Sequence, residues 1–311
     1  MEGTLILNLS YSDSDAKAAV LFINSVIKYM KENNFYIGEK IDVNGKFLAI
    51  EDIDFDSVVL PANQKKSIKI GALDFFKKKE IYAKAGLSFK RGMLLTGQPG
   101  TGKTLLGKIL MKQTESTFIW VTAAMMQEAS DVDYLFRMAS ELGNCILFLE
   151  DIDDYLEKSG AVDVLKTAMD GLGGLNDGIV TILCTNFPDR IPKALCRPGR
   201  LDEIFILQLP DEALRYKILM QVSKEMDLEN REEELQKLAK ETEGLTPACL
   251  KEIIIYSLLL AVDDERETIN KEDLSTATFK VKDTKETVTD RLSEIDEKKL
   301  VIEIKKSKES D

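Results

Sequence analysis

The chain has 311 residues, 44% of them hydrophobic and 31% charged, a composition typical of a soluble globular protein with one large domain or two smaller ones. Its formal net charge of -12 argues against unaided binding to nucleic acids or anionic membranes, although a local basic patch would still permit specific nucleic-acid binding. The absence of histidine excludes histidine-dependent catalysis and histidine-ligated metals, so we expect any general base to be a carboxylate.

The cysteine pattern and the apolar stretches bear on the compartment. The four cysteines show no CxxC spacing, which is typical of small buried side chains in a reducing compartment. The N-terminus lacks the positive charge of a signal peptide. The longest apolar stretch, Ile253–Val262, is shorter than the roughly 20 residues that cross a bilayer. We therefore expect a cytoplasmic protein without a membrane span.

Residues 1–54 form the first predicted segment, which is mixed in secondary structure and carries no recognisable chemistry. Within it, residues 16–34 place apolar side chains at helical spacing, with Val20, Ile23 and Ile27 on one face. Residues 45–55, with the sequence GKFLAIEDIDF, have a more strand-like pattern.

Residues 55–210 alternate short apolar runs with helical segments. Near-continuous apolar runs of this length are typical of strands that are covered on both faces. The pattern therefore predicts an α/β fold with a mostly parallel sheet. The expected strands are residues 92–96, 117–123, 145–151, 178–186 and 203–209.

Residues 211–282 lose the strand pattern and show helical periodicity instead, which predicts a second, all-helical domain. Residues 283–311 are highly charged, and we expect them to form a solvated tail.

A phosphate-binding loop is predicted between the strand at 92–96 and the helix that follows it. The sequence GQPGTGKT contains GxxxxGKT in the strand–loop–helix context that this pattern needs. Glycines let backbone N–H groups approach phosphates, Lys103 reaches the β- and γ-phosphates, and Thr104 offers its hydroxyl to Mg²⁺. The expected nucleotide-binding residues are Gly97, Gln98, Pro99, Gly100, Thr101, Gly102, Lys103, Thr104 and Leu105.

The stretch LFLEDID ends another apolar strand with two adjacent carboxylates, Glu150 and Asp151. A nucleotidase with a phosphate loop needs one acidic residue beside the loop for Mg²⁺ and its waters. A second carboxylate can polarise the attacking water. Because adjacent strand residues point in opposite directions, one carboxylate can serve the metal and the other the water. We therefore expect Thr104 and Glu150 as metal ligands.

Residues 55–280 resemble an AAA+ ATPase, of the branch called the AAA proteins. GQPGTGKT matches its Walker A motif, ILFLEDID its Walker B motif, and RPGRLDEIFILQLP its second region of homology. GLTPACLKEI resembles the start of the lid helix that carries the sensor 2 region, which adds Ala248 to the expected nucleotide contacts. Phe55–Val59 occupies the place of the family's adenine-contacting stretch but lacks the usual glycines.

The resemblance also implies roles. Asn186 stands at the family's sensor 1 position and would help to position the attacking water. Arg197 and Arg200 stand at the arginine-finger positions and would reach the γ-phosphate bound to a neighbouring subunit. The resemblance therefore implies ATP and Mg²⁺ as cofactors and a homo-oligomeric ring, expected to be a hexamer.

Two departures from the family pattern stand out. The usual order of the strand-end carboxylates is Asp then Glu, whereas this chain has Glu150 then Asp151, an order also found in the mitochondrial AAA translocase that inserts the Rieske iron–sulfur protein. By position, Glu150 would serve the metal and Asp151 the attacking water. The Asp side chain is shorter than that of Glu by roughly 1.5 Å. The sequence leaves open which of the two is the general base. The segment AAMMQEASDVDYLF lacks the aromatic–hydrophobic–Gly triplet of peptide-threading loops, and Met125 and Met126 either line a pore or pack a helix.

The leading interpretation is ATP hydrolysis coupled to remodelling or translocation of an unidentified protein partner by an oligomeric ring. One alternative is a nucleic-acid motor or loader of the wider AAA+ class, which the net charge of -12 disfavours. Another is a nucleotide-binding scaffold that hydrolyses little, a possibility raised by the exchanged carboxylates.

Overall fold

The computed structural model describes residues 17–18, 20–22, 25, 35–171 and 177–285. The helix expected over residues 16–34 and the charged tail expected from residue 283 lie largely outside these ranges.

A six-stranded parallel sheet forms the centre of the fold, in the order β1-β3-β4-β5-β2-β6. The predicted α/β fold with a parallel sheet is therefore confirmed. The strands are β1 (Lys40–Asp42), β2 (Arg91–Thr96), β3 (Thr117–Thr122), β4 (Cys145–Glu150), β5 (Ile179–Thr185) and β6 (Glu203–Ile206).

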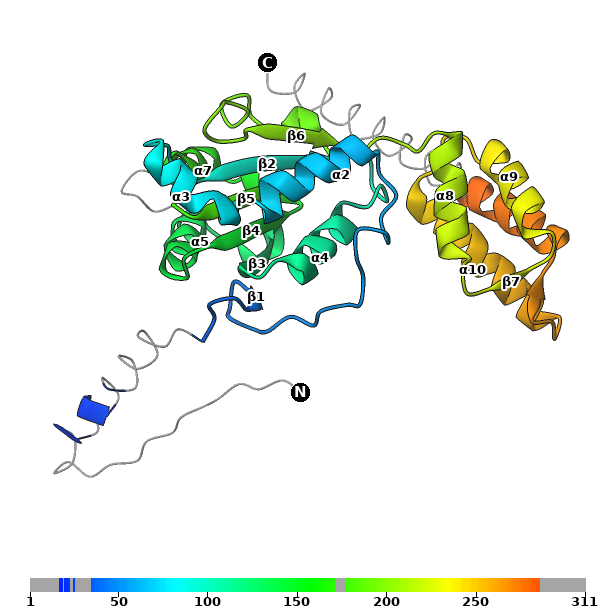
Figure 1. Ribbon diagram of the computed structural model, residues 1–311, viewed down its shortest axis with the longest axis horizontal. Helices are drawn as coiled ribbons and strands as arrows, with labels where there is room; N and C mark the ends of the chain where they lie inside the picture. The colour runs from blue at the N-terminus through cyan, green and yellow to red at the C-terminus, as the bar shows by residue number, and fades with distance from the viewer. Residues whose placement is uncertain (1–16, 19, 23–24, 26–34, 172–176, 286–311) are drawn as a thin grey trace, which may run out of the picture.

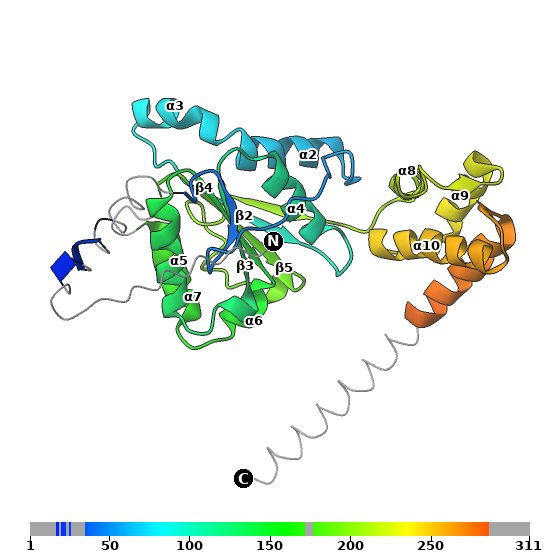
Figure 2. The ribbon, with the colours of Figure 1, turned by 90° about the horizontal axis from the view of Figure 1, so that it is seen from below.

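Helices cover both faces of this sheet (Figures 1 and 2). On one face, α2, η2 and α4 pack with strand residues such as Ile146 and Phe148. On the other face, α5, α6 and α7 pack with the alternate residues Leu147 and Leu149. Because successive side chains of a strand point to opposite faces, one apolar run supplies both cores, which explains its continuous hydrophobicity.

The helical elements of this layered region are mostly short. They are α2 (Ala62–Ile68), the π-helix η2 (Lys69–Leu73), α3 (Lys79–Lys84), α4 (Lys103–Gln113), α5 (Ser130–Glu141), α6 (Ile152–Leu156), α7 (Ala161–Asp170) and the 3₁₀ turns η3 (Phe76–Lys78), η4 (Ala123–Met125) and η5 (Pro188–Arg190).

The C-terminal region forms a separate helical unit beside the sheet (Figure 1). It contains α8 (Glu212–Val222), α9 (Arg231–Glu241), α10 (Pro247–Asp263) and a further helical stretch over residues 271–285. Asp211 and Thr246 cap α8 and α10 by accepting hydrogen bonds from the backbone N–H three residues later. The unit is predicted to be all-helical, but it also contains a short parallel pair of strands, β7 (Asp227–Leu228) and β8 (Thr268–Ile269). None of the described helices is both long enough and apolar enough to cross a bilayer.

The strand predicted over residues 45–55 is wrong. Only Phe47 forms a β-bridge there, with Ile41 of β1, and the rest of the segment runs as an irregular connection. Its acidic side chains engage α4 instead, where Glu51 pairs with Lys108 and Asp52 with Lys112. The segment thus touches the edge strand β1 only at its start, where the Leu48 N–H donates to the Lys40 carbonyl at 2.8 Å, and then runs along α4 instead of continuing a ladder.

The connection from β3 to α5 holds the two methionines in different environments. Met126 is completely buried, whereas Met125 is 38% exposed. Lys158 donates to the carbonyl of Met126, and the Tyr155 hydroxyl donates to the carbonyl of Ala129 at 3.2 Å. The connection is therefore bound to α6 and the turn that follows it, and only Met125 of the pair faces solvent.

Candidate active site

The loop between β2 and α4 has the backbone of a phosphate cradle. Gly97, Gly100 and Gly102 have φ values of 151°, 81° and 104°, which residues with a Cβ rarely adopt. Space is also limited, because a Cβ on Gly100 would lie 3.0 Å from that of Ala248. The Ala248 N–H donates to the Gly100 carbonyl at 3.2 Å. The expected Ala248 contact is thus a contact between α10 and the loop itself.

Lys103 begins α4 and folds back over the loop. Its Nζ donates to the carbonyl of Gly97 at 2.6 Å and to that of Gln98 at 3.1 Å. Burial lowers the pKa of Lys103, and nearby carboxylates, including Asp151, act in the opposite direction. The ammonium group is therefore held by neutral carbonyl acceptors, and anionic phosphate oxygens can replace them as stronger partners.

Glu150 ends β4 and is held from two sides. The Thr104 hydroxyl donates to its Oε1, and the indole Nε1 of Trp120 donates to its Oε2 at 3.1 Å. The structure thus brings together the two residues that the sequence predicts as metal ligands.

Asp151 follows in a left-handed conformation, with φ 50° and ψ 47°. Asp tolerates this region better than most residues that carry a Cβ. Its Oδ1 accepts a hydrogen bond from Nδ2 of Asn186 at 3.2 Å. The predicted base and the predicted sensor are therefore neighbours at the ends of adjacent strands β4 and β5.

A buried carboxyl group supports this edge of the sheet. Asp153 accepts a hydrogen bond from Thr185 at the end of β5, and the Thr185 oxygen accepts one from the Phe187 N–H at 2.8 Å. Burial, followed by repulsion from Asp151 and Asp154, raises the pKa of Asp153 to about 6. These bonds hold both residues that flank Asn186.

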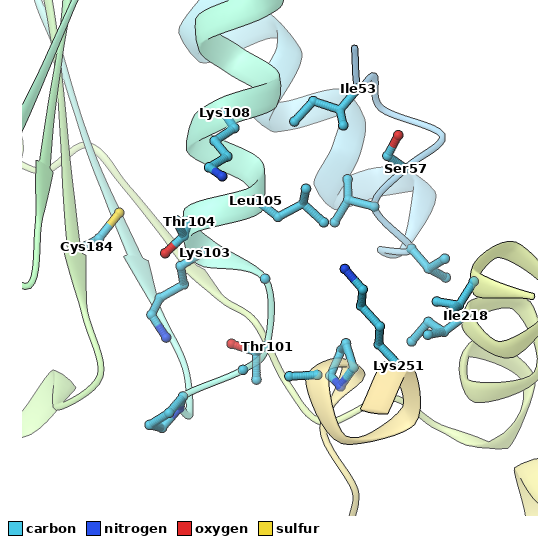
Figure 3. A pocket seen from close by; sticks show the side chains of 18 of the residues that line it. Ile53, Ser57, Thr101, Lys103, Thr104, Leu105, Lys108, Cys184, Ile218 and Lys251 are labelled. Carbon is cyan, nitrogen blue, oxygen red and sulfur yellow. The ribbon is translucent and has the colours of Figure 1, made fainter. Parts of the chain in front are cut away.

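Residues 99–105 of the phosphate loop and α4, together with Glu150, Asp151 and Asn186, line one cavity of about 710 Å³ between the sheet and α8 and α10 (Figure 3). Its phosphate-loop side carries Lys103 and Thr104, and Ile218 lies on the opposite side (Figure 3). Lys251 extends into it from α10, on the side of Ile218 and away from Lys103 (Figure 3). The lining residues are Glu51, Ile53, Ser57, Val58, Val59, Pro99, Gly100, Thr101, Gly102, Lys103, Thr104, Leu105, Lys108, Glu150, Asp151, Cys184, Asn186, Ile218, Gln221, Val222, Pro247, Ala248 and Lys251.

The two arginines of the RPGR stretch differ from each other, and neither lines this cavity. Arg200 forms a bidentate pair with Asp170 at the end of α7, with N–O distances of 2.6 and 2.7 Å, and also donates to the Ala194 carbonyl. This pair raises the pKa of Arg200 and lowers that of Asp170. Arg197 is exposed, and its side chain makes no hydrogen bond or ion pair found among the described residues.

The oxygen atoms of Thr104 and Glu150 fit Mg²⁺, which is usually bound by one or two protein oxygens together with substrate phosphates and water. The described residues contain no group of three acidic or cysteine side chains that would enclose a metal without such partners. The site therefore suits a metal ion that arrives with its nucleotide.

Sequence reasoning missed two residues of this region. Lys251 lies one helical turn after Ala248 on α10. Because residues one turn apart share a face of a helix, the expected Ala248 contact could have predicted it. Trp120 lies in the middle of an apolar strand, and only the structure shows its bond to Glu150.

Comparisons with known proteins give the same family. The family described as "ATPase family associated with various cellular activities (AAA)" matches residues 93–209. A proteasome-activating nucleotidase of Methanococcus maripaludis is 33% identical over 253 residues, covering 76% of this chain and 61% of the relative. That of Methanopyrus kandleri is 32% identical over 303 residues, covering 85% and 69%.

A second group of relatives comprises ATP-dependent zinc metalloproteases named FtsH. The chloroplastic protein of Nicotiana tabacum is 33% identical over 237 residues, covering 70% of this chain but only 33% of that protein. The chain thus corresponds to only part of the length of these relatives. The chain belongs to the AAA family of ATPases.

Proposed function

We propose that the chain hydrolyses ATP with Mg²⁺ and that an oligomeric ring of it uses this reaction to remodel or translocate a protein partner. The observation that carries the hydrolysis is the convergence, in one cavity, of a phosphate loop, a strand-end carboxylate pair and Asn186. A loop that served only to bind phosphate would need neither the second carboxylate nor the amide.

Neighbouring residues at the phosphate end of the cavity have different proposed roles. Lys103 exchanges its two carbonyl acceptors for the β- and γ-phosphate oxygens. Thr104 and Glu150 would hold Mg²⁺, which supplies charge neutralisation on the phosphates. The loop glycines Gly100 and Gly102 orient the triphosphate through their backbone N–H groups.

We propose Asp151 as the general base and Asn186 as the residue that orients the attacking water. The left-handed backbone of Asp151 supports its place in the exchanged order, because Asp tolerates this conformation better than Glu does. Glu150, in turn, has the longer reach from the strand end to Thr104. Each residue type thus suits the backbone and the distance at its own position.

We propose that Arg197 acts on the nucleotide of a neighbouring subunit. It lies outside the cavity of its own chain, and its exposed side chain has no polar partner among the described residues. Arg200 is held by Asp170 of the same chain and positions the loop that carries Arg197. A ring, expected to be a hexamer, would bring each Arg197 to the next cavity.

The partner is proposed to be a protein. The names of the relatives associate them with a proteasome and with proteolysis, and the net charge of -12 weighs against a nucleic-acid motor. The β3–α5 connection is hydrogen-bonded to Tyr155 and Lys158, and it lacks the aromatic triplet of peptide-threading loops. Both features favour remodelling of a protein over threading of its chain. The likeness of the exchanged carboxylates to those of the Rieske-protein translocase agrees with this choice.

The test is phosphate release from ATP by the purified chain, with Mg²⁺ and with EDTA, alongside sedimentation with ATP. Turnover that needs both Mg²⁺ and an assembled ring supports the proposal. ATP binding without turnover would identify the chain as a scaffold, and absence of ATP binding would contradict the assignment of the site.

A further inference from the structure

Trp120 makes the only polar side-chain bond to Glu150, other than that of Thr104, among the described residues. Its indole Nε1 donates to Oε2 at 3.1 Å, while Thr104 donates to Oε1. The two oxygens of one carboxylate are therefore held by donors from two different elements, α4 and β3. A carboxylate fixed at both oxygens cannot rotate freely about its terminal bond.

The indole is itself held firmly. In the β3–β4 register Trp120 pairs with Phe148 and Thr122 pairs with Glu150, so the tryptophan lies two residues behind the carboxylate on the neighbouring strand. Its ring packs against that of Phe148 with centroids 4.5 Å apart, and its side chain is 8% exposed. The aromatic core on this face of the sheet thus fixes the direction of the N–H bond.

We propose that Trp120 is a positioning residue for Mg²⁺: it orients Glu150 so that the longer carboxylate can serve the metal at a place where the family usually has Asp. This inference rests on the proposed ATPase function. An Asp at position 150 would be shorter by roughly 1.5 Å and could not keep both bonds without movement of the strand end. Donors that orient a metal-binding carboxylate typically change metal affinity by about 10–100-fold when removed.

A purely structural role has to be separated from this one, because a buried indole N–H needs an acceptor whatever its function. The distinguishing quantity is the ratio of the ATP affinity with saturating Mg²⁺ to that in EDTA. A structural defect lowers both affinities or the melting temperature, whereas loss of metal positioning lowers this ratio alone.

The experiment measures ATP affinity calorimetrically, with Mg²⁺ and with EDTA, for the full chain and for Trp120→Phe. Phenylalanine keeps an aromatic ring against Phe148 but donates no hydrogen bond. We expect the ratio to fall about tenfold while the affinity in EDTA stays unchanged. The matched control is Phe136→Leu, which removes a fully buried ring from the core on the opposite face of the sheet, away from Trp120; it should lower the melting temperature and leave the ratio unchanged.

An unchanged ratio in a folded Trp120→Phe variant would overturn the proposal. If neither the unmodified chain nor the variant binds ATP, the proposed function fails instead, and the two failures are thus distinguishable. A second measurement needs no change at position 120. Trp120 is the single tryptophan of the sequence, so all tryptophan emission reports its surroundings.

Adding Mg²⁺ to the ATP-bound chain should change this emission, because the metal withdraws electron density from the carboxylate that accepts the indole hydrogen bond. The change should be lost in Glu150→Leu, which has no acceptor. Emission that does not respond to Mg²⁺, or that responds equally in Glu150→Leu, would contradict the proposed coupling.

Discussion

The phosphate end of the cavity differs in one respect from two cations of this chain, Arg197 and Lys251. The reacting side chains at the phosphate end are already bonded within the chain, as Lys103 is to loop carbonyls, Glu150 to Thr104 and Trp120, and Asp151 to Asn186. Arg197 and Lys251, by contrast, make no hydrogen bond or ion pair found among the described residues.

This difference separates the side chains that one chain positions by itself from those whose partner must be a ligand or another subunit. Bonds within the chain hold the reacting groups in place before substrate arrives, which reduces reorganisation during the reaction. A long cation without a partner remains free to bind a group that the chain itself lacks. We therefore expect substitutions in the first group to damage the site directly, and substitutions in the second to show which ligand or neighbour is missing.

The largest effect should come from Lys103→Ala. When ATP binds, we expect the Lys103 ammonium to leave its carbonyl acceptors for phosphate oxygens. Loss of this charge should weaken ATP binding by about a hundredfold, or ~3 kcal/mol. Isothermal titration measures this directly. The control is Lys112→Ala on the same helix, whose partner is the exposed Asp52; it should change affinity little. ATP binding of normal strength by Lys103→Ala would contradict the assignment of the phosphate end.

Asp151→Asn should separate chemistry from binding. The amide keeps the shape of the side chain but cannot accept a proton, so kcat should fall by about 10²–10⁴ while ATP affinity changes little. Glu150→Gln should instead raise the Mg²⁺ concentration needed for activity. Steady-state hydrolysis against Mg²⁺ distinguishes the two. If the effects are interchanged, Glu150 is the base and Asp151 serves the metal.

A smaller effect is expected from Lys251→Met, which keeps the aliphatic part of the side chain. Because the amine lies on the Ile218 side of the cavity, away from Lys103, we expect it to donate to the base or ribose. ATP and ADP affinities should then fall by the same factor, about three- to tenfold. The matched control is Lys237→Met on the exposed surface of α9, which should change neither. A loss confined to ATP would place the amine at the γ-phosphate.

The smallest effect concerns Asp153 and pH. Its pKa is raised to about 6, so the folded chain holds this proton more tightly than the unfolded chain does. Its contribution to stability is therefore fully present below about pH 4 and is lost as pH rises through about 6. Between pH 7.5 and pH 5.5 the wild-type chain should gain up to about 1 kcal/mol relative to Asp153→Asn. Urea unfolding at both values tests this, and equal pH dependence would contradict it.

Local sequence patterns predicted much of this molecule because the physics behind them is local. GxxxxGKT requires a particular loop between a strand and a helix, and an apolar run that ends in carboxylates requires a strand end. The bond from Trp120 to Glu150 escaped prediction because its acceptor lies on the neighbouring strand, and the pairing of Arg200 escaped it because Asp170 comes from α7, thirty residues earlier in the chain. The strand expected at residues 45–55 failed because the segment leaves β1 after one bridge and its acidic side chains pair with α4, and the local pattern does not show these distant partners.

The central claim is that one chain supplies the phosphate end and another supplies Arg197. The most direct test mixes Arg197→Ala with Asp151→Asn, after showing by sedimentation that the two variants assemble together. Each alone should bind ATP and hydrolyse it poorly, since an arginine supplied by a neighbour is typically worth about 10³–10⁵ in rate. Mixed rings contain sites with an intact Asp151 from one chain and an intact Arg197 from the other, so the account predicts that turnover returns on mixing. Assembled mixtures that stay inactive, or a wild-type chain that hydrolyses ATP at full rate as a monomer, would contradict it.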